Sequence, residues 1–101
     1  MEQLKFKKLD YTVKDKDGNE TKHASEGVLP SRATAGDAGL DLWSTRITNE
    51  LDNSGKLILV YHTDIAVEIP EGYVGLLVPK SSIAERSLML CNHAGIIDSG
   101  Y

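Results

Sequence analysis

The 101-residue sequence predicts an all-β domain of the sandwich or jelly-roll kind, and three observations support this fold class. Apolar and polar residues alternate with a period of two over most of the chain, as they do in half-covered strands. Short clusters of Asp, Asn, Ser and Gly separate these segments and are typical of turns. Only residues 81–86 have a helical pattern, with a serine able to cap it. We therefore expect many short strands and one helical turn in a single domain over residues 1–101.

The N-terminal segment predicts two strand phases followed by a turn. Apolar residues occupy the even positions of residues 4–6 but the odd positions of residues 9–13. Because side chains alternate between faces along a strand, this change of phase predicts a bulge or a switch between sheets near residues 7–8. The polar residues 15–19 then form a turn, in which Gly18 can take a positive φ.

The middle of the chain predicts further strands separated by turns. A polar turn at residues 52–55 precedes the alternating segments 57–61 and 65–69, and Glu71-Gly72 supplies the next turn. Residues 73–78 form an almost unbroken apolar run that ends at a proline. Such a run is typical of a strand covered on both faces.

The C-terminal segment predicts a pair of strands, residues 88–90 and 94–97, joined around the Cys91-Asn92-His93 turn. The single Cys91 cannot form an internal disulfide, which favours a reducing compartment, and we expect it to be a buried thiol. The histidines of the sequence are too scattered to propose a metal site, and we expect each to be a surface or hydrogen-bonded residue.

Composition excludes several classes of function. Lys and Arg number 11 against 15 Asp and Glu, for a net charge of −4, so the chain has no general attraction for nucleic acid or for an anionic membrane. No segment approaches the roughly 20 apolar residues of a membrane span, and the N-terminus has no apolar signal segment, which predicts a cytoplasmic protein. A domain this small buries only about two thirds of the surface that its unfolded chain exposes. It must therefore be stable with a small hydrophobic core or share a core with other chains.

Three segments carry polar groups that a scaffold does not require. Residues 35–42 place two carboxylates among glycines just before a strand, residues 79–83 place a lysine and two serines where an apolar strand ends, and residues 92–101 combine an amide, a carboxylate and a tyrosine. A cation beside hydroxyls and backbone N–H groups suits an anion. Asn92 and Asp98 are six residues apart and point to one side of an extended segment. Taken one by one, the three segments can also be explained as a solvated turn, a helix cap and a turn carboxylate.

Together and in this order, the three segments resemble the first three motifs of the trimeric dUTPase family. The matching letters are A-G-D-A-G-L-D-L, P-K-S-S-I and A-G-I-I-D-S-G-Y, within residues 35–101. The resemblance implies a jelly-roll-like, β-clip dUTPase fold that is incomplete in this chain. It also implies a homotrimer with active sites at subunit junctions, which cleaves dUTP to dUMP and pyrophosphate.

The resemblance assigns the third motif to chemistry and base recognition. Asp98 becomes the general base that deprotonates the water attacking the α-phosphorus. General-base catalysis typically raises a reaction rate by about 10²–10⁴-fold. Tyr101 packs on the deoxyribose, leaving no room for a 2′-hydroxyl. Asn92, with the backbone of the turn at residues 90–94, hydrogen-bonds the uracil edge, and Gly95 lies in the same substrate-binding segment.

The resemblance assigns the other two motifs to the triphosphate. Ser81 and Ser82 belong to the phosphate-binding segment, where Lys80 supplies the cation. Lysine replaces the family's usual arginine there, which keeps the charge but loses the bidentate fork. Asp41 helps to hold Mg²⁺ through water, and the ion neutralises charge and aligns the leaving pyrophosphate.

The family continues beyond its third motif to a fourth motif and a glycine-rich fifth one, whereas this sequence stops at Tyr101. We therefore expect a truncated dUTPase-like domain that is poorly folded and inactive when it is made as 101 residues alone.

Two alternatives remain. A dCTP deaminase of the same fold also has a serine-rich second segment, but it needs a well-placed glutamate base, and Glu85 lies on the predicted helical turn. The second alternative is a non-catalytic β module that binds nucleotide or protein. The presence of both Asp98 and Tyr101 argues against this alternative.

Overall fold

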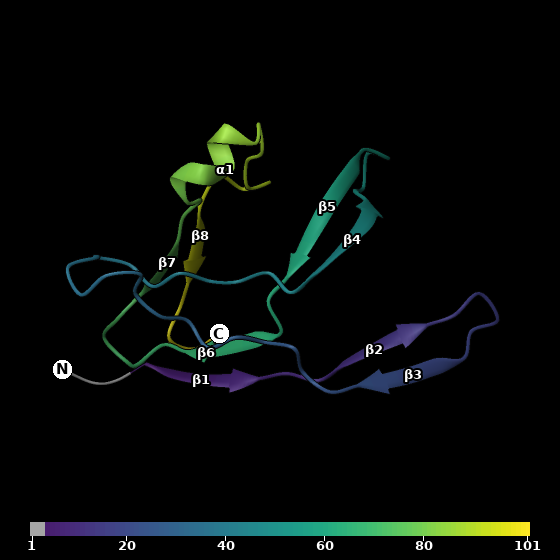
Figure 1. The fold of residues 1–101 in the computed structure, drawn as a ribbon, viewed down its shortest axis with the longest axis horizontal. Helices are drawn as coiled ribbons and strands as arrows, with labels where there is room; N and C mark the ends of the chain where they lie inside the picture. Colours follow the sequence, from purple (N-terminus) through teal and green to yellow (C-terminus); the bar gives the residue numbers. More distant parts are fainter. Residues whose placement is uncertain (1–3) are drawn as a thin grey trace. The chain divides into compact units, whose positions relative to one another are not determined.

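The computed structural model describes residues 4–101, and its regular elements are strands apart from one short helix (Figure 1), which confirms the all-β prediction. Four two-stranded sheets join β1 with β6, β2 with β3, β4 with β5, and β7 with β8. The elements are β1 (Lys5–Lys8), β2 (Tyr11–Lys14), β3 (Glu20–His23), β4 (Arg46–Leu51), β5 (Leu57–His62), β6 (Ile65–Glu68), β7 (Gly75–Leu77), α1 (Ser81–Glu85) and β8 (Gly95–Ile97).

The chain divides into two compact units. The N-terminal unit is Phe6–Ala66, and the C-terminal unit is Val67–Tyr101 with the first residues of the chain. The expectation of a single domain over residues 1–101 stays a prediction.

The β2–β3 hairpin of the N-terminal unit turns as the sequence predicts. The Asp15 carboxylate accepts hydrogen bonds from the backbone N–H groups of Asp17 and Asn19, both at 2.9 Å, and Gly18 has a φ of +83°. The interruption before this hairpin falls later than expected, because β1 continues through Lys8. Leu9 is the first residue after the strand, and its N–H donates to the carbonyl oxygen of Asp64 at 2.8 Å.

The β4–β5 hairpin confirms the predicted turn at residues 52–55. One carboxylate oxygen of Asp52 accepts hydrogen bonds from the Ser54 hydroxyl at 2.7 Å and from the Lys56 N–H at 2.8 Å. These hydrogen bonds, that of the Ser54 hydroxyl first, lower the pKa of Asp52. Gly55 supplies the positive φ of +83° that closes the turn. The side chain of Asp52 therefore sets the register of the hairpin.

The apolar run at residues 73–78 differs from its prediction as a covered strand. Only Gly75–Leu77 are in a strand, and Val74, Leu76 and Val78 are all more than half exposed. A two-stranded sheet covers little of its own surface, so an apolar strand within it stays accessible. Among the described residues, Ile69 is the one hydrophobic side chain that is buried, at 7% exposure.

The predicted pairing of residues 88–90 with residues 94–97 is wrong. Residues 88–90 are not in a strand, and β8 instead pairs antiparallel with β7, with Leu76 opposite Ile96 and Leu77 opposite Gly95. A Cβ atom on Gly95 would lie 3.3 Å from the Leu77 Cβ, so the glycine permits the close approach of the two strands. Cys91 is exposed rather than buried.

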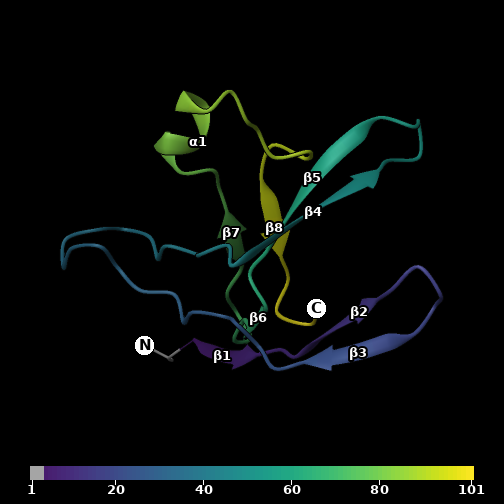
Figure 2. The same ribbon diagram turned by 45° about the vertical axis from the view of Figure 1, so that its right-hand side comes forward.

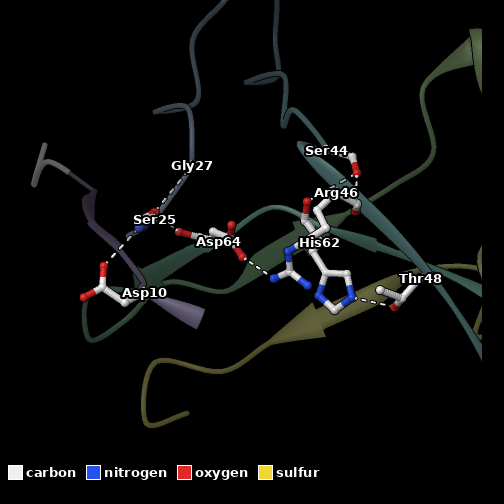
Figure 3. A network of polar contacts seen from close by, with 8 residues as sticks. All are labelled: Asp10, Ser25, Gly27, Ser44, Arg46, Thr48, His62 and Asp64. Carbon is white, nitrogen blue, oxygen red and sulfur yellow. Dashed lines mark hydrogen bonds and ion pairs between the residues drawn. The ribbon is translucent and has the colours of Figure 1, made fainter. Parts of the chain in front are cut away.

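A shielded ion pair organises the N-terminal unit (Figure 3). The guanidinium of Arg46 donates to the Asp64 carboxylate at 2.9 Å, and the Asp64 side chain is only 6% exposed. The Arg46 guanidinium carbon lies 3.9 Å from the centroid of the Tyr11 ring, which stacks on the His23 ring at 5.0 Å. Arg46 thus joins β4 to the base of the β2–β3 hairpin by a cation–π contact as well as by an ion pair.

The backbone of Asp64 also holds neighbouring segments of the N-terminal unit. Its φ is +54°, and its carbonyl oxygen accepts hydrogen bonds from the Leu9 N–H at 2.8 Å and the Ser25 hydroxyl at 3.3 Å. Gly27 passes so close that a Cβ atom would lie 2.7 Å from the same carbonyl oxygen. Only glycine fits at position 27 without moving this backbone.

Replacing Gly27 by alanine tests this close approach. In the complete protein, Gly27→Ala should lower the free energy of unfolding by about 1–3 kcal/mol, because the new methyl group overlaps backbone rather than a flexible side chain. Urea denaturation provides the measurement. Gly36→Ala is the matched control, since nothing lies within 4 Å of its Cβ position. Equal stabilities of the two variants would contradict the prediction.

Replacing Arg46 by methionine tests the ion pair. Arg46→Met leaves the shielded Asp64 carboxylate without its cation and should cost about 3–5 kcal/mol in thermal or urea unfolding. Lys14→Met removes an exposed pair with Glu20, whose atoms are 3.9 Å apart, and should cost at most about 1 kcal/mol. A loss from Arg46→Met no larger than that from Lys14→Met would show that the ion pair does not hold the unit together.

Candidate functional site

A pocket of about 380 Å³ lies in the C-terminal unit and contains two of the residues that the sequence singled out, Lys80 and Ser81. The remaining lining residues are Pro79, Leu88, Met89, Leu90 and His93. Its walls therefore combine apolar side chains with an ammonium, a hydroxyl and an imidazole group. Apolar walls with a few polar groups are typical of small-ligand sites.

The short helix α1 forms one side of this pocket. It follows β7 and begins at Ser81, and the predicted helical turn is thereby confirmed (Figures 1 and 2). The N–H groups of Arg86 and Leu88 both donate to the Ile83 carbonyl oxygen, at 3.1 and 3.2 Å, and Ser87 has a φ of +55°. This tight reversal returns the chain, so that residues 88–90 line the same pocket as Lys80 and Ser81.

The turn at residues 90–94 also contributes to the pocket, through Leu90 and His93. The His93 N–H donates to the Leu90 carbonyl oxygen at 3.1 Å, and the Ala94 N–H donates to the Asn92 carbonyl oxygen at 2.7 Å. His93 has a φ of +65° and lines the pocket, and Asn92 lies outside the pocket lining; both residues are exposed. Ser82 is half-buried in α1, outside the pocket lining.

Asp98 and Tyr101 follow β8 and are both exposed, Tyr101 completely. The Tyr101 N–H donates to the Asp98 carbonyl oxygen at 3.2 Å, so a turn brings these two residues close together. The exposed Asp98 carboxylate is open to water, and the Tyr101 ring is available for contact with another molecule.

The first motif lies in the N-terminal unit, and its two carboxylates differ in role. Asp37 closes its own turn, because its carboxylate oxygens accept the N–H of Thr34 at 3.0 Å and the hydroxyl of Thr34 at 2.7 Å. Asp41 is half-buried, and its N–H donates to the Ser31 carbonyl oxygen at 2.8 Å.

Asp41 is the carboxylate that the sequence predicts as a metal ligand. Within residues 4–101, no three His, Cys, Asp or Glu side chains gather in a way that could hold a metal by themselves. Mg²⁺ keeps several waters and usually takes only one or two carboxylates, with the phosphates of a substrate completing its shell. A single carboxylate such as Asp41 therefore fits Mg²⁺ held mainly by a ligand's phosphates.

Among the polar residues that line the pocket, His93 is the one whose side chain no motif of the sequence assigns to a role. In the sequence it is one of the scattered histidines, and no spacing rule connects it to Lys80. The sequence offered one signal for His93, namely that it directly follows Asn92 in a turn whose first glycine is Gly95.

No helix among residues 4–101 is long and apolar enough to cross a membrane.

Comparison with known proteins places this region in a family. The family model described as dUTPase matches residues 25–101. Three curated relatives, each described as deoxyuridine 5'-triphosphate nucleotidohydrolase, match with similar coverage. The relative from Escherichia phage T5 is 41% identical over 78 residues, covering 72% of this chain and 52% of the relative. The Mycolicibacterium vanbaalenii relative is 45% identical over 74 residues, covering 72% and 46%. The Tropheryma whipplei relative is 38% identical over 76 residues, covering 74% and 50%.

The chain thus spans about half the length of the curated relatives that it matches. No solved structure matched the chain. The matched segment begins at residue 25, after the β2–β3 hairpin, and includes all three motifs.

Proposed function

The chain belongs to the dUTPase family, and on this premise we propose that the protein hydrolyses dUTP to dUMP and pyrophosphate, and so serves dUMP biosynthesis and nucleotide metabolism. The observation that carries the proposal is the match over residues 25–101, which contains all three motifs in order. The pocket that combines Lys80 and Ser81 with a mostly apolar wall supports it, because a nucleotide presents both an anionic chain and a ring.

Asp98 is the proposed general base. Its carboxylate takes a proton from a water molecule whose oxygen forms a bond to the α-phosphorus. The bond from that phosphorus to the bridging oxygen breaks, and pyrophosphate leaves with the bonding electrons. The exposure of Asp98 supports this role, since the base must be within reach of water.

Asn92 and Tyr101 are the proposed nucleoside-binding residues, with Gly95 in the same segment. An amide both donates and accepts hydrogen bonds, so Asn92 can distinguish uracil from cytosine, and an unpaired group costs about 1–3 kcal/mol when the base is wrong. The exposed Tyr101 ring is free to pack on a deoxyribose and to exclude the 2′-hydroxyl.

Lys80, Ser81 and Ser82 are the proposed residues for the phosphate chain. The ammonium of Lys80 attracts the triphosphate, and the hydroxyl of Ser81 donates a hydrogen bond to it. Asp41 would hold Mg²⁺ through water. When bound there, the ion would supply positive charge that offsets the charge of the phosphates and helps to align the leaving pyrophosphate.

We also propose that the protein acts as a cytoplasmic homotrimer that binds neither nucleic acid nor membrane. Exposed apolar side chains on β5 and β7 support assembly, because a soluble domain seldom leaves neighbouring apolar residues uncovered. The net charge of −4 supports the absence of nucleic acid from its ligands.

The products of the reaction decide between the proposed function and its alternatives. The complete protein should release pyrophosphate from dUTP in the presence of Mg²⁺, and it should release no ammonia from dCTP. Ammonia from dCTP would identify a deaminase, and binding of dUTP with no product would identify a non-catalytic module.

Substitution of Asp98 tests the assignment of the base. In the complete protein, Asp98→Asn should lower kcat for dUTP by about 10²–10⁴-fold, because the amide cannot accept the proton of the water. The affinity for a non-hydrolysable dUTP analogue should change little. Asp17→Asn makes the same chemical change on an exposed turn and should leave kcat unaltered. Normal turnover by Asp98→Asn would refute the assignment.

A further inference from the structure

The two-stranded sheet of β7 and β8 has a glycine opposite a large side chain at each of its ends. Gly75 of β7 pairs with Ile97 of β8, and Leu77 of β7 pairs with Gly95 of β8. A glycine within a strand has no side chain to pack and weakens the strand, so it often marks a place where another segment approaches closely. The two pairs lie on one face of the sheet, because they are two positions apart along each strand.

The contact at Gly75 leaves no space for a side chain. A Cβ atom on Gly75 would lie 2.9 Å from the Ile69 Cδ1 atom and 3.1 Å from the Ile97 Cβ atom. Ile69 is itself buried, at 7% exposure, so its side chain has little room to yield. The Cβ atom of Ile97 moves only with the backbone of β8. A methyl group at position 75 would therefore displace the end of β8.

The end of β8 determines where Asp98 lies. Asp98 directly follows Ile97, which is in register with Gly75. On its other side, the Tyr101 N–H donates to the Asp98 carbonyl oxygen at 3.2 Å. Aspartate has a short side chain, so a displacement of its backbone carries the carboxylate with it.

We propose that Gly75 is a positioning residue for the proposed base. By leaving space for Ile97, it fixes the end of β8 from which Asp98 continues, and it acts on the reaction through Ile97 rather than by contact with substrate. This inference rests on the proposed function and adds to it a residue outside the three motifs. A general base must lie within hydrogen-bond reach of its water, and a misplacement of about 1 Å can lower the rate by about 10²-fold.

Two substitutions of Gly75 test the inference in the complete protein. Gly75→Ala adds the methyl group that overlaps both isoleucines. Ile69→Val removes the Cδ1 atom at 2.9 Å, so the double variant Gly75→Ala/Ile69→Val keeps mainly the overlap with Ile97 and stays informative if the single substitution unfolds the protein. Ile69→Val alone is the control, because it loosens the same packing without adding a methyl group opposite Ile97. Unfolding curves give the temperature below which each variant is folded, and kinetics are measured there.

The readouts are kcat for dUTP and the Kd for a non-hydrolysable dUTP analogue. Both Gly75 variants should lower kcat by about tenfold to 10²-fold and change the Kd by less than about threefold, because the base is misplaced while the binding groups remain. Ile69→Val should change kcat by less than about twofold.

A double-mutant cycle with Asp98→Asn separates positioning from a merely structural role. In the Asp98→Asn protein the base is already lost, so Gly75→Ala should lower the residual kcat by less than about threefold. A structural defect would instead lower kcat by the same factor with and without Asp98, and that result would overturn the inference.

The remaining outcomes distinguish this inference from the proposed function. If the wild-type protein hydrolyses dUTP and the folded Gly75 variants keep its kcat, the inference is overturned while the function stands. A weakened affinity for the analogue with an unchanged kcat would also overturn the inference alone. If the wild type releases no pyrophosphate from dUTP, the proposed function fails, and the inference fails with it.

Discussion

The N-terminal unit depends on the ion pair between Arg46 and Asp64. Arg46 belongs to β4 and Asp64 immediately precedes β6, and the guanidinium also covers the ring of Tyr11 at the start of β2. A two-stranded hairpin is at most marginally stable by itself, so two such hairpins need a shared anchor. The carbonyl oxygen of Asp64 adds hydrogen bonds from Leu9 and Ser25 at the same place. One residue pair therefore connects segments that lie far apart in the sequence.

The strands themselves contribute little burial. On β5, Ile58 and Val60 are half-buried, while Leu57, Leu59 and Tyr61 on the other face are 43–61% exposed. A strand with apolar residues on both faces is typical of a sheet that is covered on both sides. The local polar network and the Asx-type turns hold the backbone, and the apolar faces remain available to other surfaces.

At the candidate site, local backbone geometry brings polar side chains together, although few side chains of the chain are buried in a core. The reversal after α1 and the strained turn at His93 bring the second motif and the start of the third to one pocket, although Lys80 and His93 are separated in the sequence by the helix and a loop. Asp98 and Tyr101 lie after β8 and face water. The proposed substrate-binding groups and the proposed base thus all lie in the C-terminal segment of the chain.

The all-β class, the turns at residues 15–19 and 52–55, and the short helix could be predicted from the sequence, because each depends on contacts within a few residues, such as the hydrogen bonds to Asp15 and Asp52. The motif order likewise predicted the family. Three features became visible only in the folded chain: β8 pairs with β7, the run at residues 73–78 is exposed, and Arg46 contacts Asp64 and Tyr11. The fold also places His93 beside Lys80. These features depend on contacts between residues distant in the chain. Periodicity shows which face of a strand a residue occupies, but not which residues that face contacts.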